Sequence, residues 1–195
     1  MENMKEDTTT TTIMKLKAIE ATPESFAEYG QVIEATGDGA EFGSQDAQLD
    51  LTNGIPRFYI LHIENRPFEF SKITHHARVT QCLGSVDREA WYLGVAKASI
   101  VEGEEINGGG GGGGRNLRSE RGGHLYVAPN VDEIRAFRIS GAKFVKLNKG
   151  TWHAGPLFRE NARDFYNLEL TDTNIVDHTC YNIGEENRVV FHIED

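Results

Sequence analysis

The sequence predicts an all-β protein, a sandwich, jelly roll or barrel, and three observations favour this class. Short apolar or alternating runs recur along the chain, separated by clusters of Gly, Pro, Asn and Asp. No long run with the 3.6-residue period of a helix interrupts them, which argues against alternating strands and helices. A length of 195 residues suffices for one sizeable core, so a single domain is expected.

The elements are expected in the following order. Residues 1–14 are polar and Thr-rich and should form a disordered tail, and residues 15–195 should form the single domain. A short helix is expected from Thr22, an N-cap before Pro23, to Gly30. Strands are expected at 31–35, 57–64, 68–74, 91–101, 124–129, 137–140, 143–147, 164–170 and 188–193.

Residues 103–123 contain seven consecutive glycines, 108–114, and are expected to form a flexible loop between two strands. A phosphate-binding loop is the alternative, but the spaced glycines, lysine and hydroxyl of such loops are missing. Arg115, Arg118 and Arg121 follow the glycines. They could reach a nearby anion site or be solvated loop charges.

Composition excludes several classes of partner. The chain has 30 acidic and 20 basic residues, a formal charge of −10, which leaves no large basic face for nucleic acid or for an anionic membrane. No apolar run reaches the length of a signal peptide or of a membrane-spanning helix. Two cysteines do not suggest a disulfide framework. A soluble, cytoplasmic protein is expected.

The pair His75-His76 stands at the end of an expected strand. Neighbouring strand residues face opposite ways, so only one of the two histidines can point into a barrel interior. Either Thr74, His76 and Arg78 line the cavity, or His75 and Ala77 do. The first set carries more useful chemistry.

A second dense group of constrained side chains is GTWHAGPLF, residues 150–158. Alternation places Thr151 and His153 on one face and Trp152 on the other. Trp152 could then pack in the core while His153 enters a pocket. The simpler interpretation is a buried tryptophan with an incidental neighbour.

These residues carry a resemblance to the cupin superfamily. Gly150 to His153, preceded by Gly141, resembles the second cupin motif, with Asn148 where that motif usually has proline. The first motif is partly matched. There Thr74 and His76 take the two histidine places, and Gln81 takes the glutamate place.

A more specific resemblance is to the ureidoglycolate lyase family. The run from Ile134 to Phe158 is similar to the family's LRAF, glycine, WHHPLF run, with Ala154-Gly155 replacing one histidine. SFAEYGQVIE, TNGIPRF, LGS and DFYNLEL extend it over most of residues 15–172, whereas the 86–123 region is longer here. The resemblance implies a double-stranded β-helix of the cupin jelly-roll type that cleaves ureidoglycolate to glyoxylate and urea, usually as a homodimer.

The chemistry suggests roles for the matched residues. His153 is the preferred base or metal ligand, with His76 beside it, because an imidazole titrates near neutral pH. Glu169 is the alternative base or orients that imidazole. Arg57 and Arg78 are candidates for the substrate carboxylate, since a guanidinium offers paired donors. Trp152 completes the candidate substrate-binding residues.

A divalent metal ion is the one cofactor to consider, with His76, Gln81 and His153 as its ligands. A neutral carboxamide in place of glutamate would weaken such a site. Two other functions therefore stay open beside the lyase. One is a metal-dependent cupin oxygenase or isomerase, and the other is a non-catalytic cupin that binds a small acid.

Overall fold

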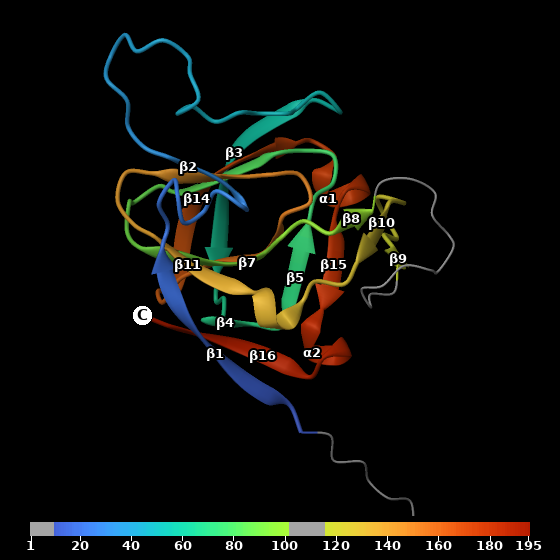
Figure 1. Ribbon diagram of the computed structural model, residues 1–195. Helices are drawn as coiled ribbons and strands as arrows, with labels where there is room; N and C mark the ends of the chain where they lie inside the picture. The colour runs from blue at the N-terminus through green and yellow to red at the C-terminus, as the bar shows by residue number, and fades with distance from the viewer. Residues whose placement is uncertain (1–9, 102–115) are drawn as a thin grey trace, which may run out of the picture.

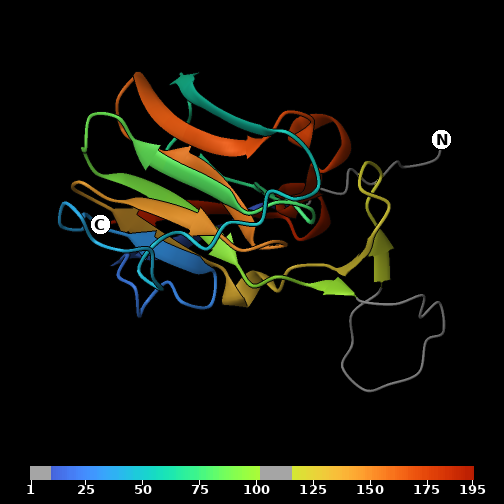
Figure 2. The same cartoon turned by 90° about the horizontal axis from the view of Figure 1, so that it is seen from above.

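The protein, described here from a computed structural model, is mostly β, and the structure describes residues 10–101 and 116–195. Two large sheets lie face to face, and a small three-stranded sheet lies at one end (Figures 1 and 2). The glycine run predicted to be flexible, 108–114, and the tail up to residue 9 lie outside the described residues. In the part of the chain that is described, no helix has the length and apolar character needed to cross a membrane.

The larger sheet has eight strands and is mixed. β1 runs parallel to both of its neighbours, β11 and β16, and the other pairs are antiparallel. The strand order is β15 (Thr179–Asn182), β5 (Lys72–His75), β13 (Trp152–Leu157), β7 (Trp91–Ala96), β11 (Arg135–Ile139), β1 (Thr12–Glu20), β16 (Val189–Glu194) and β4 (Glu69–Phe70).

The second sheet has five antiparallel strands, in the order β2 (Gly30–Ile33), β12 (Phe144–Leu147), β6 (Gln81–Ser85), β14 (Ala162–Leu170) and β3 (Pro56–Glu64). The small sheet contains β8 (Ile100–Val101), β10 (Leu125–Val127) and β9 (Asn116–Arg118). Three short helical turns complete the described chain: η1 (Val131–Glu133), α1 (Thr173–Val176) and α2 (Ile183–Glu186).

The main core lies between the two large sheets. Trp91, Leu93 and Val95 alternate along β7 and pack in one cluster with Leu83 of β6 and Phe165 of β14. Alternation along each strand of the five-stranded sheet therefore sends one set of side chains into the core and the other set to the outer face. A second apolar cluster lies on the other face of β5, β7 and β13.

Three expectations about the chain's organisation are wrong. Residues 12–14, expected in the tail, belong to β1, which pairs with two strands. Where this helix was expected, residues 23–29 form consecutive turns and no helix, although Thr22 Oγ1 accepts a hydrogen bond from the Ser25 amide. The segment is too short for a helix to stabilise itself. Residues 116–118, expected in the flexible loop, form β9.

Candidate functional site

A small cavity lies between the two large sheets, where β6 and β12 approach the ends of β5 and β13. The free space there admits no water molecule while the side chains stand as they do. It is lined by His76, Val79, Gln81, Leu147, Asn148, Thr151 and His153. Three of the residues predicted from the sequence, far apart in the chain, therefore meet at one place.

β13 positions His153 at this cavity. His153 pairs with Thr74 of β5, and Trp152 points to the opposite face, as the alternation predicts. His153 Nδ1 lies 3.1 Å from the carbonyl oxygen of Thr151, which can only accept, so Nδ1 carries the proton. Nε2 is then an acceptor, and the Thr74 hydroxyl is 3.5 Å away, too far for a good hydrogen bond.

The surroundings of His153 keep its ring neutral. The side chain is buried, and this burial, with a smaller electrostatic contribution from the neighbouring His76 ring, lowers the pKa of His153 to about 3. At neutral pH the ring can therefore accept a proton at Nε2 or offer its lone pair to a ligand. It cannot serve as a cation for a carboxylate.

His76 follows the end of β5 and is held by Asp177. The Asp177 carboxylate accepts hydrogen bonds from the backbone amides of Ala77 and Arg78, each at 2.8 Å. The Asp177 carbonyl oxygen accepts the His76 Nδ1 proton at 2.7 Å, which leaves Nε2 as an acceptor. The ring centroids of His76 and His153 are 5.3 Å apart.

Gln81, at the start of β6, contributes a third acceptor. Its amide nitrogen donates to Asn167 Oδ1 at 3.1 Å and to Glu169 Oε2 at 3.3 Å. Both partners are acceptors in this pairing, so they fix which end of the amide is nitrogen. Gln81 Oε1 is buried, and no described residue gives it a hydrogen bond. A buried acceptor without a partner is costly unless a ligand or water satisfies it.

Glu169 is positioned to support Gln81 and not to act as a base. It lies on β14, is 1% exposed, and accepts hydrogen bonds from Tyr59 at 3.1 Å and Asn174 at 3.3 Å besides that of Gln81. Arg57 lies 3.7 Å from the same carboxylate and stacks over the Tyr59 ring. The Glu169 oxygens are thus engaged with protein groups. Arg57 lies on the far side of Glu169 from the cavity wall.

The arrangement offers His76 Nε2, His153 Nε2 and Gln81 Oε1 to whatever occupies the cavity. All three atoms accept hydrogen bonds and none carries a formal charge. A matching ligand must bring hydrogen-bond donors, such as hydroxyl and amide groups, or a cation. A carboxylate would have to lie elsewhere.

Two residues near this cavity were missed or undervalued by the sequence argument. The His178 ring lies beside that of His76, tilted to it, with ring centroids 5.6 Å apart, although its position in the sequence suggested nothing. Arg121 donates a hydrogen bond to the carbonyl oxygen of Asn174. Burial and the charges of His76 and Arg121 lower the pKa of His178. The sequence feature that could have indicated a site at His178 is the short run TCYN directly after it, which forms β15 and pairs with β5.

Two predicted substrate-binding residues lie elsewhere. The Arg78 guanidinium donates to the carbonyl of Asn53 at 2.9 Å and lies 3.8 Å from Asp172, so it does not line the cavity. The strand alternation that grouped it with His76 ends at His75. Trp152 is fully buried on the other face, where its ring nitrogen donates to Ser99.

The donor set fits a resident metal ion poorly. Across residues 10–101 and 116–195 no three His, Cys, Asp or Glu side chains are grouped so as to hold a metal. The predicted set of His76, Gln81 and His153 supplies two imidazoles and a carboxamide, with no anionic ligand to neutralise a divalent ion. We therefore derive no chemical step through a metal.

Comparison of the chain with protein-family models and with curated proteins finds no match.

Proposed function

We propose that the protein is a cupin-type jelly-roll enzyme of the ureidoglycolate lyase kind, which cleaves ureidoglycolate to glyoxylate and urea. The observation that carries the proposal is the meeting of three acceptor atoms, on His76, His153 and Gln81, in one buried cavity. Ureidoglycolate has a carbinol hydroxyl and a ureido group on one carbon. These are the hydrogen-bond donors that the cavity requires.

The reaction needs a base and no redox partner. His153 Nε2 takes the proton of the carbinol hydroxyl, and the electrons of that O–H bond form the new carbonyl as the carbon–nitrogen bond breaks. The electron pair of the broken bond goes to the ureido nitrogen, which takes the proton back from the imidazole. Glyoxylate and urea result without any co-reactant, and Gln81 Oε1 orients the ureido N–H groups.

The substrate carboxylate requires a cation outside the three acceptors. Arg57 and Arg121 flank the Glu169–Asn174 hydrogen bond next to the cavity. We assign the substrate carboxylate to this side of the cavity. Of the two arginines predicted to bind it, Arg57 and Arg78, only Arg57 lies here. A guanidinium there can pair with both oxygens of a carboxylate.

Entry of the substrate requires movement at the cavity's rim. The space admits no water-sized molecule as it stands, so side chains of its wall, among them Asn148 and Thr151, must move before a substrate can enter. Changes of side-chain rotamer at a binding surface are common when a partner binds. Both cysteines are free, which agrees with a cytoplasmic place of action.

The test is to incubate the purified chain with ureidoglycolate and to measure glyoxylate, urea and ammonia separately. Equal amounts of glyoxylate and urea, without ammonia, are expected. Ammonia as the first nitrogen product would identify an amidohydrolase instead. Thermal stabilisation by the substrate without turnover would identify a binding protein, and metal-dependent oxygen uptake would identify an oxygenase.

A further inference from the structure

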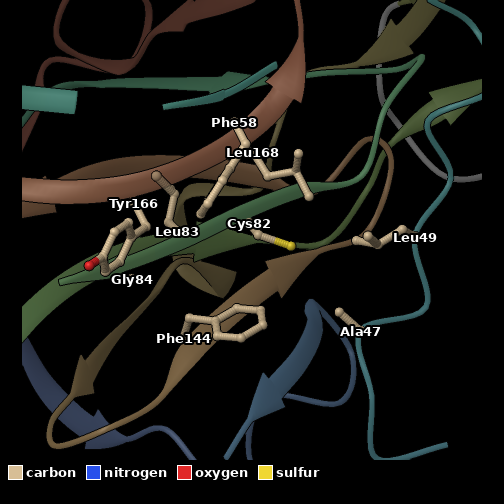
Figure 3. A pocket seen from close by; sticks show the side chains of 9 residues that line it. All are labelled: Ala47, Leu49, Phe58, Cys82, Leu83, Gly84, Phe144, Tyr166 and Leu168. Atoms are coloured by element: carbon tan, nitrogen blue, oxygen red, sulfur yellow. The ribbon is translucent and has the colours of Figure 1, made fainter. Parts of the chain in front are cut away.

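The outer face of the five-stranded sheet carries an apolar groove of about 450 Å³. Figure 3 shows its side chains, which come from several separate parts of the chain. Cys82 and Gly84 of β6 lie in its middle, and Phe58, Phe144 and Leu168 lie around them. Sites for small organic molecules usually have volumes of roughly 300–1,000 Å³, so the groove has the size of such a site.

A buried lysine lies beside this groove. Lys146 of β12 pairs directly with Cys82 of β6, so the two side chains lie on the same face of the sheet. Phe144, two residues before Lys146 on the same strand, lies on that face as well. Lys146 is only 6% exposed. A positively charged side chain therefore adjoins a groove whose own lining is apolar.

The Lys146 amine has no anionic partner in the described chain. Among residues 10–101 and 116–195 its one hydrogen bond is from Nζ to Asn148 Oδ1, a neutral acceptor, at 2.7 Å. No ion pair of those residues includes it. Burial lowers the pKa of Lys146, because the charged amine loses water without gaining a counter-ion. A bound anion would relieve this cost.

The chain around the groove does not supply that anion. One rim of the groove contains Ala47 and Leu49, and the next residue, Asp50, forms an ion pair with Lys149. The Asp50 carboxylate is therefore already engaged. Lysine has a flexible four-carbon stem, so the Lys146 amine can turn from its neutral acceptor toward a ligand in the groove.

We infer that the groove binds a small apolar carboxylic acid, with its hydrocarbon chain among the apolar side chains and its carboxylate on Lys146. The apolar lining accounts for the chain, and the ammonium group without a counter-ion accounts for the acid. A neutral apolar molecule would leave Lys146 unpaired. The site is on the opposite face of the sheet from the cavity of His76 and His153, and the inference does not depend on the proposed reaction.

The experiment compares the binding of decanoate and of decanol to the full chain by isothermal titration calorimetry. The two probes share a hydrocarbon chain and differ in the head group. Decanoate should bind with a Kd at least about 10-fold lower than that of decanol, the effect of one charge-assisted hydrogen bond. Lys146→Met should remove this preference and leave decanol binding unchanged. Lys72→Met, at an exposed lysine of β5 in the other sheet, is the control and should bind both probes as the wild type does.

A second variant tests the place of the hydrocarbon chain. Phe58 is 69% exposed, so Phe58→Glu should fold, and it should weaken both probes at least about 10-fold because apolar contact is replaced by a charge. Circular dichroism establishes that each variant is folded. Equal affinity of the wild type for the two probes, or a preference for decanoate that Lys146→Met leaves intact, overturns the inference. No binding of decanoate to the wild type up to about 1 mM overturns it as well. Because the wild type alone distinguishes the two probes, the test holds even if a variant fails to fold.

Discussion

His75 and His76 are consecutive in sequence, yet they have opposite surroundings. His75 packs against Trp152, with ring centroids 4.0 Å apart, and its Nε2 lies 2.7 Å from Nε2 of His124. His76 faces the cavity, where its Nε2 meets no hydrogen-bond partner in the described chain but lies near His153. His75 also has a ring nitrogen without a partner, Nδ1, but it is buried among protein groups, whereas the free Nε2 of His76 lies at the cavity.

The comparison teaches that burial alone does not identify a reactive histidine. Burial lowers the pKa of both His75 and His153 to about 3, so a perturbed pKa occurs on both faces of the sheet. The difference lies in what the acceptor nitrogen faces. A site requires an unsatisfied atom directed into a space that a ligand can enter.

The largest expected effect comes from replacing one histidine on each face of the sheet, His153 at the cavity and His124 beside His75. His153→Gln removes the base and should lower kcat/KM for ureidoglycolate about 1000-fold. His124→Gln, on the other face, keeps a hydrogen-bond partner for His75 and should leave kcat/KM unchanged. Steady-state kinetics of both variants, with urea as the measured product, checks this. An equal loss in both variants would contradict the division into a reactive and a structural face.

A smaller effect is expected at the third acceptor. Gln81→Met keeps the size of the side chain but removes Oε1, which we assign to the ureido group. KM should rise about 10-fold, the effect of one lost hydrogen bond to a buried group. Gln48→Met, an exposed glutamine outside the cavity, is the matched control. A fall in kcat with unchanged KM would argue that Gln81 acts on the reacting carbon instead.

A third effect concerns stability and is expected equally on the two faces of the sheet. An unfolded histidine binds a proton near pH 6.5, whereas folded His75 and His153 do so only near pH 3. The stability from these neutral rings is therefore complete above pH 6.5 and is lost as the pH falls toward 3. Each ring should lower the free energy of unfolding by about 2 kcal/mol between pH 7 and pH 5.

Urea unfolding at several pH values measures this loss. His75→Phe keeps an aromatic ring against Trp152 and should remove the share of about 2 kcal/mol that His75 contributes to this loss. An unchanged pH dependence in His75→Phe would mean that His75 is not the neutral buried ring described here.

Much of the fold could be predicted from the alternation of apolar residues and from the turn residues between the alternating runs. All nine expected strand segments contain strands, because alternating apolar residues bounded by turn residues leave few other structures. β1 was missed although Met14, Leu16 and Ala18 alternate with polar residues. Because polar, Thr-rich residues precede this pattern, its first residues were assigned to a disordered tail. β15 was missed because TCYN is short and only its pairing with β5 stabilises it.

The site was predictable as far as strand alternation extends. Thr74 and His153 share a face because β5 and β13 are regular there. His76 and Arg78 lie beyond the strand, where Asp177 sets the course of the backbone, so the predicted grouping of those two failed. A contact between residues about a hundred positions apart has no local signature in a single sequence.

β14 connects the two faces of its sheet. Its inward residue Glu169 holds Gln81 in place, and Tyr166, three positions earlier, lies at an apolar groove on the outer face. Occupancy of either side restrains the same short stretch of backbone. If occupancy of the cavity strengthens binding at the groove through this strand, occupancy of the groove must strengthen binding in the cavity by the same factor, because the two equilibria form one thermodynamic cycle.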